Sequence, residues 1–419
     1  MAAFAGMRGT GDWVTDQRPK NFRQGLLYLY PNGTAPLTAI NSMGRSRRVD
    51  DPEFAYFSKE LETRQTTLIG AFIYDDEPLT VASSGAMSAG DAQYLSFVGI
   101  VAQRLNYRPG MVVRLVDASN PDVYCLAKVV TINDDNVHVT LLQAATVSAM
   151  DTVHVVGNVN EEGAIIPASV SYDATKFTNY TQIFRTPLDI TRTAALTRLR
   201  TGNPYKELKR EALQYHGIDM EWSAFFGEKT ENTGSGGKPE RTTQGLISFI
   251  KEHESANVRD WVADGSTTWA AGGEDWLDTY LEQVFRYGRN EKTMFAGSAA
   301  ILAINQLVKN TGQFNFTHET TSYGINIVKW DGPFGRINIV NHPLFTQTAL
   351  YRKMAVIMEP ENVNFSYITD TMFKPDPAQK EGGFSAYDAV KEEYLTEAGW
   401  EFQFAKTGMV MYNLGDNAT

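Results

Sequence analysis

The chain has 419 residues, of which 42% are hydrophobic and 11% aromatic, and its formal net charge is −11. This composition excludes a disordered chain, and the length predicts two or three domains rather than one. The acidic balance argues against a dedicated nucleic-acid binder.

The sequence shows no sign of export or of membrane insertion. No apolar run approaches the ~18 residues that a membrane span needs, and residues 1–15 have no signal-peptide pattern. We therefore expect a protein that stays in the cytoplasm or is released from it by lysis. The single cysteine, Cys125, excludes an intrachain disulfide and a four-cysteine zinc site.

Residues 1–50 are expected to form an extended arm, because prolines and glycines interrupt them and only the short run 26–30 is apolar. Ordering costs about 1–2 kcal/mol per residue, so the arm should depend on a neighbouring subunit, and removing residues 1–48 should leave a folded body. These 48 residues hold seven basic and two acidic side chains, which suits contact with acidic protein or with a polyanion. The candidate contact residues are Arg18, Arg23, Arg45, Arg47 and Arg48.

Strand signals follow the arm, first around residues 54–56 and then over 66–74. Residues 79 to about 165 look like a separate small β module. Within it, strands are expected over 111–116, 123–132, 137–142 and 152–156, with a tight turn at 133–136. We predict a barrel of about five strands, inserted into a host domain that resumes near residue 164.

Residues 203–227 predict one long helix, around which the rest of the chain is organised. Asn203 is a good N-cap, Pro204 suits the first helical position, and Gly227 is a natural stop. An apolar stripe at 3.6-residue spacing should pack on a sheet, to which a strand over 179–190 contributes. The stripe consists of Tyr205, Leu208, Ala212, Tyr215, Trp222 and Phe226. We place Glu221 on the opposite, charged side of the helix.

The C-terminal half of the chain mixes helices with strands. Residues 230–241 are rich in glycine and are expected to form a flexible loop. Residues 245–254 are expected to form a short helical or mixed segment, and helices are predicted over 275–287 and 299–309. A hairpin is predicted over 324–330 and 336–341, and further strands over 354–368 and 389–413.

A search for catalytic and metal-binding residues finds no active site. The six histidines never show a ligand spacing such as HExxH. Residues 234–238 resemble a phosphate-binding loop, but Asn232 replaces its first glycine and Pro239 stands where Ser or Thr should bind magnesium. There is no GxSxG motif, and Cys125 has no adjacent histidine. We predict that the protein is not an enzyme and needs no cofactor or metal.

The order of the segments resembles the major capsid proteins of tailed bacteriophages, which have the Hong Kong 97-like fold. Residues 11–37, beginning Gly-Asp-Trp-Val-Thr-Asp, are similar to the N-terminal arm of one branch of that family. Asp51-Pro-Glu-Phe54 resembles the start of its extended loop, and residues 179–186 resemble the return strand of that loop. Phe295-Ala-Gly-Ser298 and Trp330-Asp-Gly-Pro-Phe-Gly335 resemble segments of the axial domain of that family. Glu397-Ala-Gly-Trp400 resembles the last strands of its peripheral domain.

The resemblance implies an α+β protein with the Hong Kong 97-like capsid fold. It also implies a domain plan: N-terminal arm 1–50, extended loop 51–78 and 164–190, peripheral domain 191–255 and 369–419 with spine helix 203–227, and axial domain 256–368. Residues 79–163 would be a small all-β, barrel-like domain inserted in the extended loop, which the simplest family members lack.

The implied function is that of a structural virion protein. Copies would self-assemble as hexamers and pentamers into an icosahedral head enclosing phage double-stranded DNA, which they would contact non-specifically. Other implied partners are a portal, a separate scaffolding protein and, as a further candidate, a decoration protein; no membrane is involved. A separate scaffold is implied because no long scaffold region precedes the arm, unless a leader was removed. Assembly would take place in the host bacterial cytoplasm.

Two other functions are alternatives to a shell. The β module could bind a glycan or a partner protein through Tyr94, Phe97, Tyr107 and Tyr124, although core packing is the alternative use of these rings. A hydrolase with an unrecognised site is the third hypothesis, which no residue pattern favours. Particles of megadalton mass would support a shell, whereas a sugar-binding monomer or dimer would support the module.

Overall fold

The computed structural model describes residues 39–40, 45–60, 64–73, 86–87, 92–97, 107–132, 136–143, 145–146, 152–167, 169, 171–197, 202–264, 267–311, 316–322, 325–376 and 388–416. The chain divides into two compact units. The main unit comprises residues 1–56 and 177–419, and the barrel unit comprises residues 57–176. Helices and strands are mixed in the main unit, which confirms the expected α+β class.

The long helix of the main unit is α3 (Pro204–Phe226), as the sequence predicts. The Asn203 side chain accepts hydrogen bonds from the backbone N–H groups of Tyr205 and Lys206, at 3.0 and 3.3 Å. Its buried face differs from the predicted stripe and consists of Ala212, His216, Met220, Glu221, Ala224 and Phe225. Tyr215 is 64% exposed. His216 and Glu221 can be buried on this face because each has a hydrogen-bond partner inside the protein.

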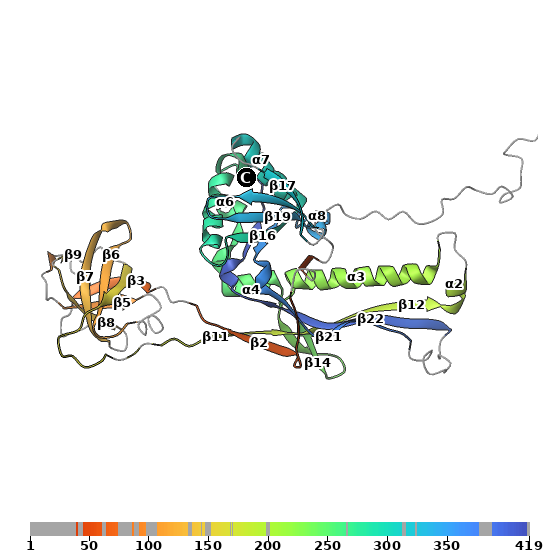
Figure 1. Ribbon diagram of the computed structural model, residues 1–419, viewed down its shortest axis with the longest axis horizontal. Coiled ribbons are helices and arrows are strands. Elements are labelled where there is room, and N and C mark those ends of the chain that lie inside the picture. The colour runs from red at the N-terminus through yellow and green to blue at the C-terminus, as the bar shows by residue number, and fades with distance from the viewer. Residues whose placement is uncertain are drawn as a thin grey trace, which may run out of the picture. The chain divides into compact units, whose positions relative to one another are not determined.

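A four-stranded sheet lies along α3 (Figure 1). Its order is β1 (Arg45–Arg48), β21 (Val363–Lys374), β22 (Ala389–Phe402) and β12 (Gln182–Thr191). Strand β22 is antiparallel to both β21 and β12, whereas β1 runs parallel to β21. Alternate residues of β12 and β22, including Phe184 and Trp400, point into the core that α3 covers.

A seven-stranded sheet forms the second layer of strands in the main unit. Its order is β15 (Val258–Asp260), β23 (Met409–Tyr412), β20 (Ala355–Met358), β16 (Glu291–Ala296), β19 (Arg336–Asn341), β18 (Ile325–Asp331) and β17 (Phe316–Ser322). The described helices of this part are α4 (Leu246–His253), α5 (Trp261–Asp264), α6 (Trp269–Phe285), α7 (Ser298–Thr311) and α8 (Pro343–Gln347). The short helix α2 (Arg192–Leu196) instead contacts β12 and α3 (Figure 1). The described residues of the unit also form 3₁₀ turns, namely η2 (Ser255–Asn257), η3 (Pro360–Asn362) and η4 (Ala405–Thr407).

Two local predictions for the main unit are corrected. Helix α6 begins at Trp269 rather than near residue 275, because Trp269 is buried and its Nε1–H donates to the carbonyl of Ala303 at 2.9 Å. The expected loop over 230–241 is a hairpin of β13 (Thr230–Thr233) and β14 (Pro239–Thr242) with four paired positions. Gly237 adopts a φ of +68° in its turn, a conformation that favours glycine.

The barrel unit contains six strands that close on themselves in the order β10-β3-β5-β8-β7-β6. They are β3 (Gln65–Ile73), β5 (Ala92–Phe97), β6 (Met111–Asp117), β7 (Asn120–Ile132), β8 (Asn136–Leu141) and β10 (Thr152–Asn158). Strand β3 was expected to belong to the extended loop, but it pairs with β10 and β5 and closes the barrel. The barrel therefore has one strand more than the five expected. Its core includes Val113, Leu115 and Cys125, all fully buried.

Two short ladders complete the described strands. Strand β2 (Glu53–Ser58) pairs with β11 (Thr175–Tyr180), and β4 (Ala86–Met87) pairs with β9 (Ala145–Thr146). At the base of the first ladder, Asn179 is buried and donates through Nδ2 to the carbonyl of Trp400 at 2.7 Å. Asn179 therefore fastens β11 to β22.

Candidate functional site

The described part of the chain offers little for catalysis. It contains no group of three or more His, Cys, Asp or Glu residues able to hold a metal ion. None of its helices is both long and apolar enough to cross a membrane. Cys125 is buried in the barrel, and burial raises the pKa of its thiol to about 11. The thiol therefore stays protonated at neutral pH and is a poor nucleophile.

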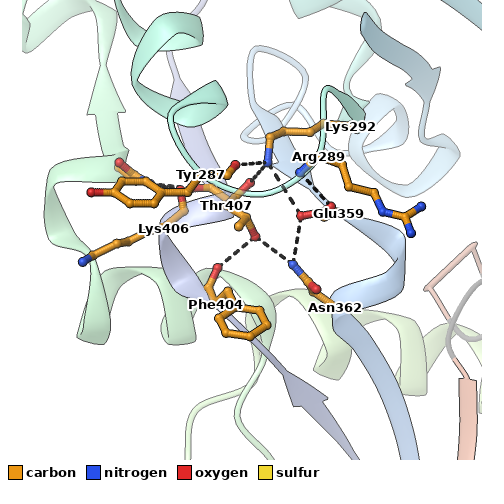
Figure 2. A network of polar contacts seen from close by, with 10 residues as sticks. Tyr287, Arg289, Lys292, Glu359, Asn362, Phe404, Lys406 and Thr407 are labelled. Atoms are coloured by element: carbon orange, nitrogen blue, oxygen red, sulfur yellow. Dashed lines mark hydrogen bonds and ion pairs between the residues drawn. The ribbon is translucent and has the colours of Figure 1, made fainter. Parts of the chain in front are cut away.

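A fully buried lysine, Lys292 on β16, forms the centre of a polar network (Figure 2). Its Nζ donates to the carbonyls of Tyr287 and Thr407, each at 3.1 Å, and lies 3.8 Å from Oε2 of Glu359. The Glu359 carboxylate also accepts the backbone N–H of Arg289 and the Nδ2–H of Asn362, both at 3.0 Å. Burial lowers the pKa of Lys292, and the charge of Glu359 opposes that shift.

The network is closed, which makes it a structural clamp rather than a reactive site. An ammonium group has three N–H donors, and three acceptors surround this one. The acceptors come from the turn before β16, from the segment before η3, and from η4. Lys292 therefore ties together three segments that lie far apart in the sequence.

Replacing Lys292 with methionine should lower the free energy of unfolding by about 3–5 kcal/mol, because Glu359 would remain buried without its cation. In the folded protein the pKa of Lys292 lies below 10.5, the value of an unperturbed lysine. At a pH between these two pKa values, the unfolded chain binds more protons at this residue than the folded protein does. Wild-type stability should therefore rise with pH in that window relative to Lys292→Met. Denaturant titrations at several pH values measure this difference.

Lys374→Met is the matched control, because Lys374 is 48% exposed and forms a 3.8 Å ion pair with Glu393. An exposed pair of this kind contributes about 0–1 kcal/mol. Equal losses in the two variants, or a stability difference for Lys292→Met that does not grow with pH, would contradict the clamp.

A second buried polar cluster, the arm anchor, consists of Ile40, Glu221 and His342. Glu221 and His342 are both fully buried. Oε1 of Glu221 accepts the backbone N–H of Ile40 at 2.8 Å and lies 3.2 Å from Nε2 of His342. The rings of Phe225 and Phe345 pack against the imidazole, with centroids 5.2 and 4.7 Å away. The anchor thus fixes residue 40 to α3 and to the chain just before α8.

The arm anchor corrects two expectations. Glu221 does not face solvent, because it supplies the acceptor for a backbone N–H that is itself buried. Ala39 and Ile40 are fully buried in the main core, so residues 39–40 are ordered by their own chain. The burial of residues 39–40 argues against the expectation that residues 1–48 can be removed without loss of the folded body.

Of the predicted contact residues, Arg18 and Arg23 lie outside the described residues. Arg45, Arg47 and Arg48 form β1, with all three side chains exposed. Alternation along the strand places Arg45 and Arg47 on one face of the sheet and Arg48 on the other. Arg47 forms a 3.7 Å ion pair with Glu401 of its own chain, whose side chain is 4% exposed. The structure thus brings two of the arginines together on one face and separates the third.

The residues of the clamp and of the anchor were missed by the sequence analysis. Glu221 and His216 follow the i, i+4 spacing of the buried helix face, and a test of helix faces that allowed buried polar residues could have found them. Lys292 stands between Glu291 and an apolar strand, which is a weak signal. Nothing in the breaker-rich arm marks residues 39–40 as core.

The chain is similar to known proteins over nearly its whole length. The model of a family described as SU10 major capsid protein matches residues 7–415. The major capsid protein of Pseudomonas phage PaMx41 is 25% identical over 395 residues, which cover 94% of this chain and 89% of that protein. A solved structure from Mycobacterium phage Bobi has a TM-score of 0.46 at 8% identity, covering 97% of this chain and 94% of its own. A solved structure from Microbacterium phage Oxtober96 has a TM-score of 0.44 at 10% identity, and the match covers 94% of this chain and 96% of the phage chain.

Proposed function

Because the chain belongs to the SU10 major capsid protein family, whose model spans residues 7–415, we propose that it closes into an icosahedral phage head around double-stranded DNA. It is a structural protein of the virion and forms the capsid shell. The match over nearly the whole chain is the observation that carries this conclusion. Hexamers and pentamers are the units from which such a shell is built.

We assign the main unit to the Hong Kong 97-like fold. Helix α3 would be the spine helix of the peripheral domain, which we assign to residues 191–255 and 369–419. The domain also takes in β1, β12 and the start of β21, because these strands belong to the sheet on which α3 lies. The seven-stranded sheet and its helices, mostly within residues 256–368, would form the axial domain. The β2–β11 ladder would be the base of the extended loop, and the barrel would be the insertion in that loop. The inclusion of β3 moves the start of the insertion before residue 79.

Several partners follow from this assignment. The shell would meet a portal at one vertex, form around a separate scaffolding protein and offer its outer surface to a decoration protein. Assembly would occur in the bacterial cytoplasm, and the shell would contact packaged DNA without sequence specificity. The net charge of −11 supports non-specific rather than specific contact with DNA.

The mass of the assembled protein tests the proposal. Sedimentation velocity of the purified chain under assembly conditions should show closed particles of megadalton mass. A discrete monomer or dimer across the accessible range of salt and protein concentration would argue against a shell. A monomer that binds glycans would favour the alternative of a binding module on the barrel.

The structure gives that alternative little support. Tyr107, one of its four candidate aromatic residues, is 3% exposed and belongs to the barrel core. Tyr124 is 47% exposed on the outside of the barrel. The side chains of Tyr94 and Phe97 lie outside the described residues. Of the two described rings, only Tyr124 is available to a ligand.

A further inference from the structure

The barrel unit has an outer surface on which basic side chains outnumber acidic ones, although the unit as a whole is acidic. The unit contains fourteen acidic and seven basic residues. Alternate residues of β6, β7 and β10 point into the core, so the residues between them point outward. Over 111–116, 124–130 and 152–158 these outward residues include cations and no carboxylate; the carboxylate of Asp122 stands at the hairpin end of β7, two positions before Tyr124. We call this surface the outer barrel face; its main side chains are Arg114, Tyr124, Lys128, Val130, His154 and Val156.

Two β-bulges direct valine side chains onto this face. The register of β10 on β6 shifts between Val155 and Gly157, and that of β7 on β8 shifts between Val129 and Thr131. The extra residues, Val156 and Val130, are 58% and 47% exposed. A bulge leaves its extra residue outside the ladder and turns its side chain. If the face became covered, both valines would bury apolar surface, which is favourable.

The polar part of the outer barrel face is already held in place. The guanidinium carbon of Arg114 lies 4.1 Å from the centroid of the Tyr124 ring. Nη2 of Arg114 also donates to the carbonyl of Pro121 at 3.2 Å. Arginine and tyrosine that are fixed before binding lose little conformational entropy in a complex, and both residue types are common interface anchors.

We propose that the outer barrel face binds an acidic surface of a second copy of this chain. The inference rests on the proposed function and names a surface through which subunits of the shell meet. Charge complementarity selects the occupant: a copy with a net charge of −11 offers carboxylates, and the face presents Arg114 and Lys128. Nucleic acid is less suited, because Val130 and Val156 would find no apolar partner on a phosphate backbone.

Cysteine labelling of the full chain tests the contact. The one native cysteine, Cys125, is fully buried, so a maleimide should report on Val156→Cys. We expect rapid labelling of dissociated subunits and at least tenfold slower labelling of assembled particles. Val123→Cys is the control, because Val123 also lies on β7 and is 38% exposed, but it stands near the hairpin end, outside the face. It should react equally fast in both states.

A charge variant supplies a second readout. Val130→Glu/Val156→Glu should fold, as judged by the melting temperature of the dissociated subunit, but should close at least tenfold fewer particles than Val123→Glu. Equal labelling of Val156→Cys in subunits and particles would overturn the proposal, as would normal assembly of the double variant. Protection that appears only after a different protein is added would also overturn it. If the wild-type chain forms no particles at all, the proposed function itself fails.

Discussion

Removal of residues 1–48 is expected to unfold the main unit, whereas removal of residues 1–38 should leave it folded. The longer deletion takes Ala39 and Ile40 out of the core, where both are fully buried. Loss of a buried isoleucine side chain costs about 2–5 kcal/mol. Glu221 would also lose the N–H of Ile40 while staying buried, at a further cost of about 1–3 kcal/mol.

The same deletion removes β1 and its four paired positions on β21. These losses together are comparable to the 5–15 kcal/mol by which a folded protein is stable. The shorter deletion touches neither the arm anchor nor β1. If the arm contacts neighbouring subunits, as its sequence predicts, the 1–38 deletion should fold normally and close few shells.

Denaturant unfolding of the dissociated protein, followed by tryptophan fluorescence, separates the two deletions. Ile40→Ala in the full chain is the matched substitution and should lose about 2–5 kcal/mol without any change in chain length. A 1–48 deletion that unfolds at the same denaturant concentration as the full chain would show that the anchor contributes nothing. Normal shells from the 1–38 deletion would show that the arm is not needed for assembly.

Replacing Arg45, Arg47 and Arg48 together with glutamate should block shell formation in the absence of DNA. The subunit has a net charge of −11, and like-charged copies repel over a Debye length of about 8 Å at physiological salt. Buried apolar area and local pairing of opposite charges must therefore offset this repulsion where copies meet. The exposed arginines of β1 are suited to pair with acidic surface on a neighbour.

Arg47 should be tested separately from Arg45 and Arg48, because it also forms an ion pair within its own chain. Arg47 pairs with Glu401 of its own chain, which is 4% exposed, so Arg47→Glu should reduce the stability of the isolated subunit as well as its assembly. Arg45→Glu/Arg48→Glu keeps that pair and should affect assembly alone. Assembly yield and melting temperature, measured on the same preparations, distinguish the two effects.

Lysine replacements at positions 45 and 48 provide a milder control. They keep the charge and lose the planar guanidinium, so moderate salt should partly rescue their assembly by screening the repulsion between copies. If the triple glutamate variant forms normal empty shells and only DNA packaging suffers, the arginines face the genome rather than protein.

Features set by a few neighbouring residues were the ones that sequence reasoning could predict. The ends of α3 follow from Asn203, Pro204 and Gly227, whose effects are local, and the structure places the helix between them. Strands β6, β7 and β8 follow from alternation and a tight turn. The family resemblance came from the order of many such segments rather than from any one of them.

Features decided by distant partners were missed. Which face of α3 is buried depends on His216 meeting Thr186 and Thr396, and on Glu221 meeting residue 40, and neither pairing is visible in the helix itself. The hairpin β13–β14 is polar throughout, so it lacks the apolar alternation that marks a strand. The membership of β3 in the barrel is a matter of pairing, which composition does not encode.

Electron cryomicroscopy of particles assembled from the purified chain tests the central claim most directly. We expect closed icosahedral shells in which α3 and its four-stranded sheet repeat in every hexamer and pentamer, each copy carrying a six-stranded barrel. The outer barrel face should lie against a neighbouring copy in the same map. Dispersed monomers or dimers, or open aggregates without icosahedral order, would contradict the claim that this chain builds a capsid.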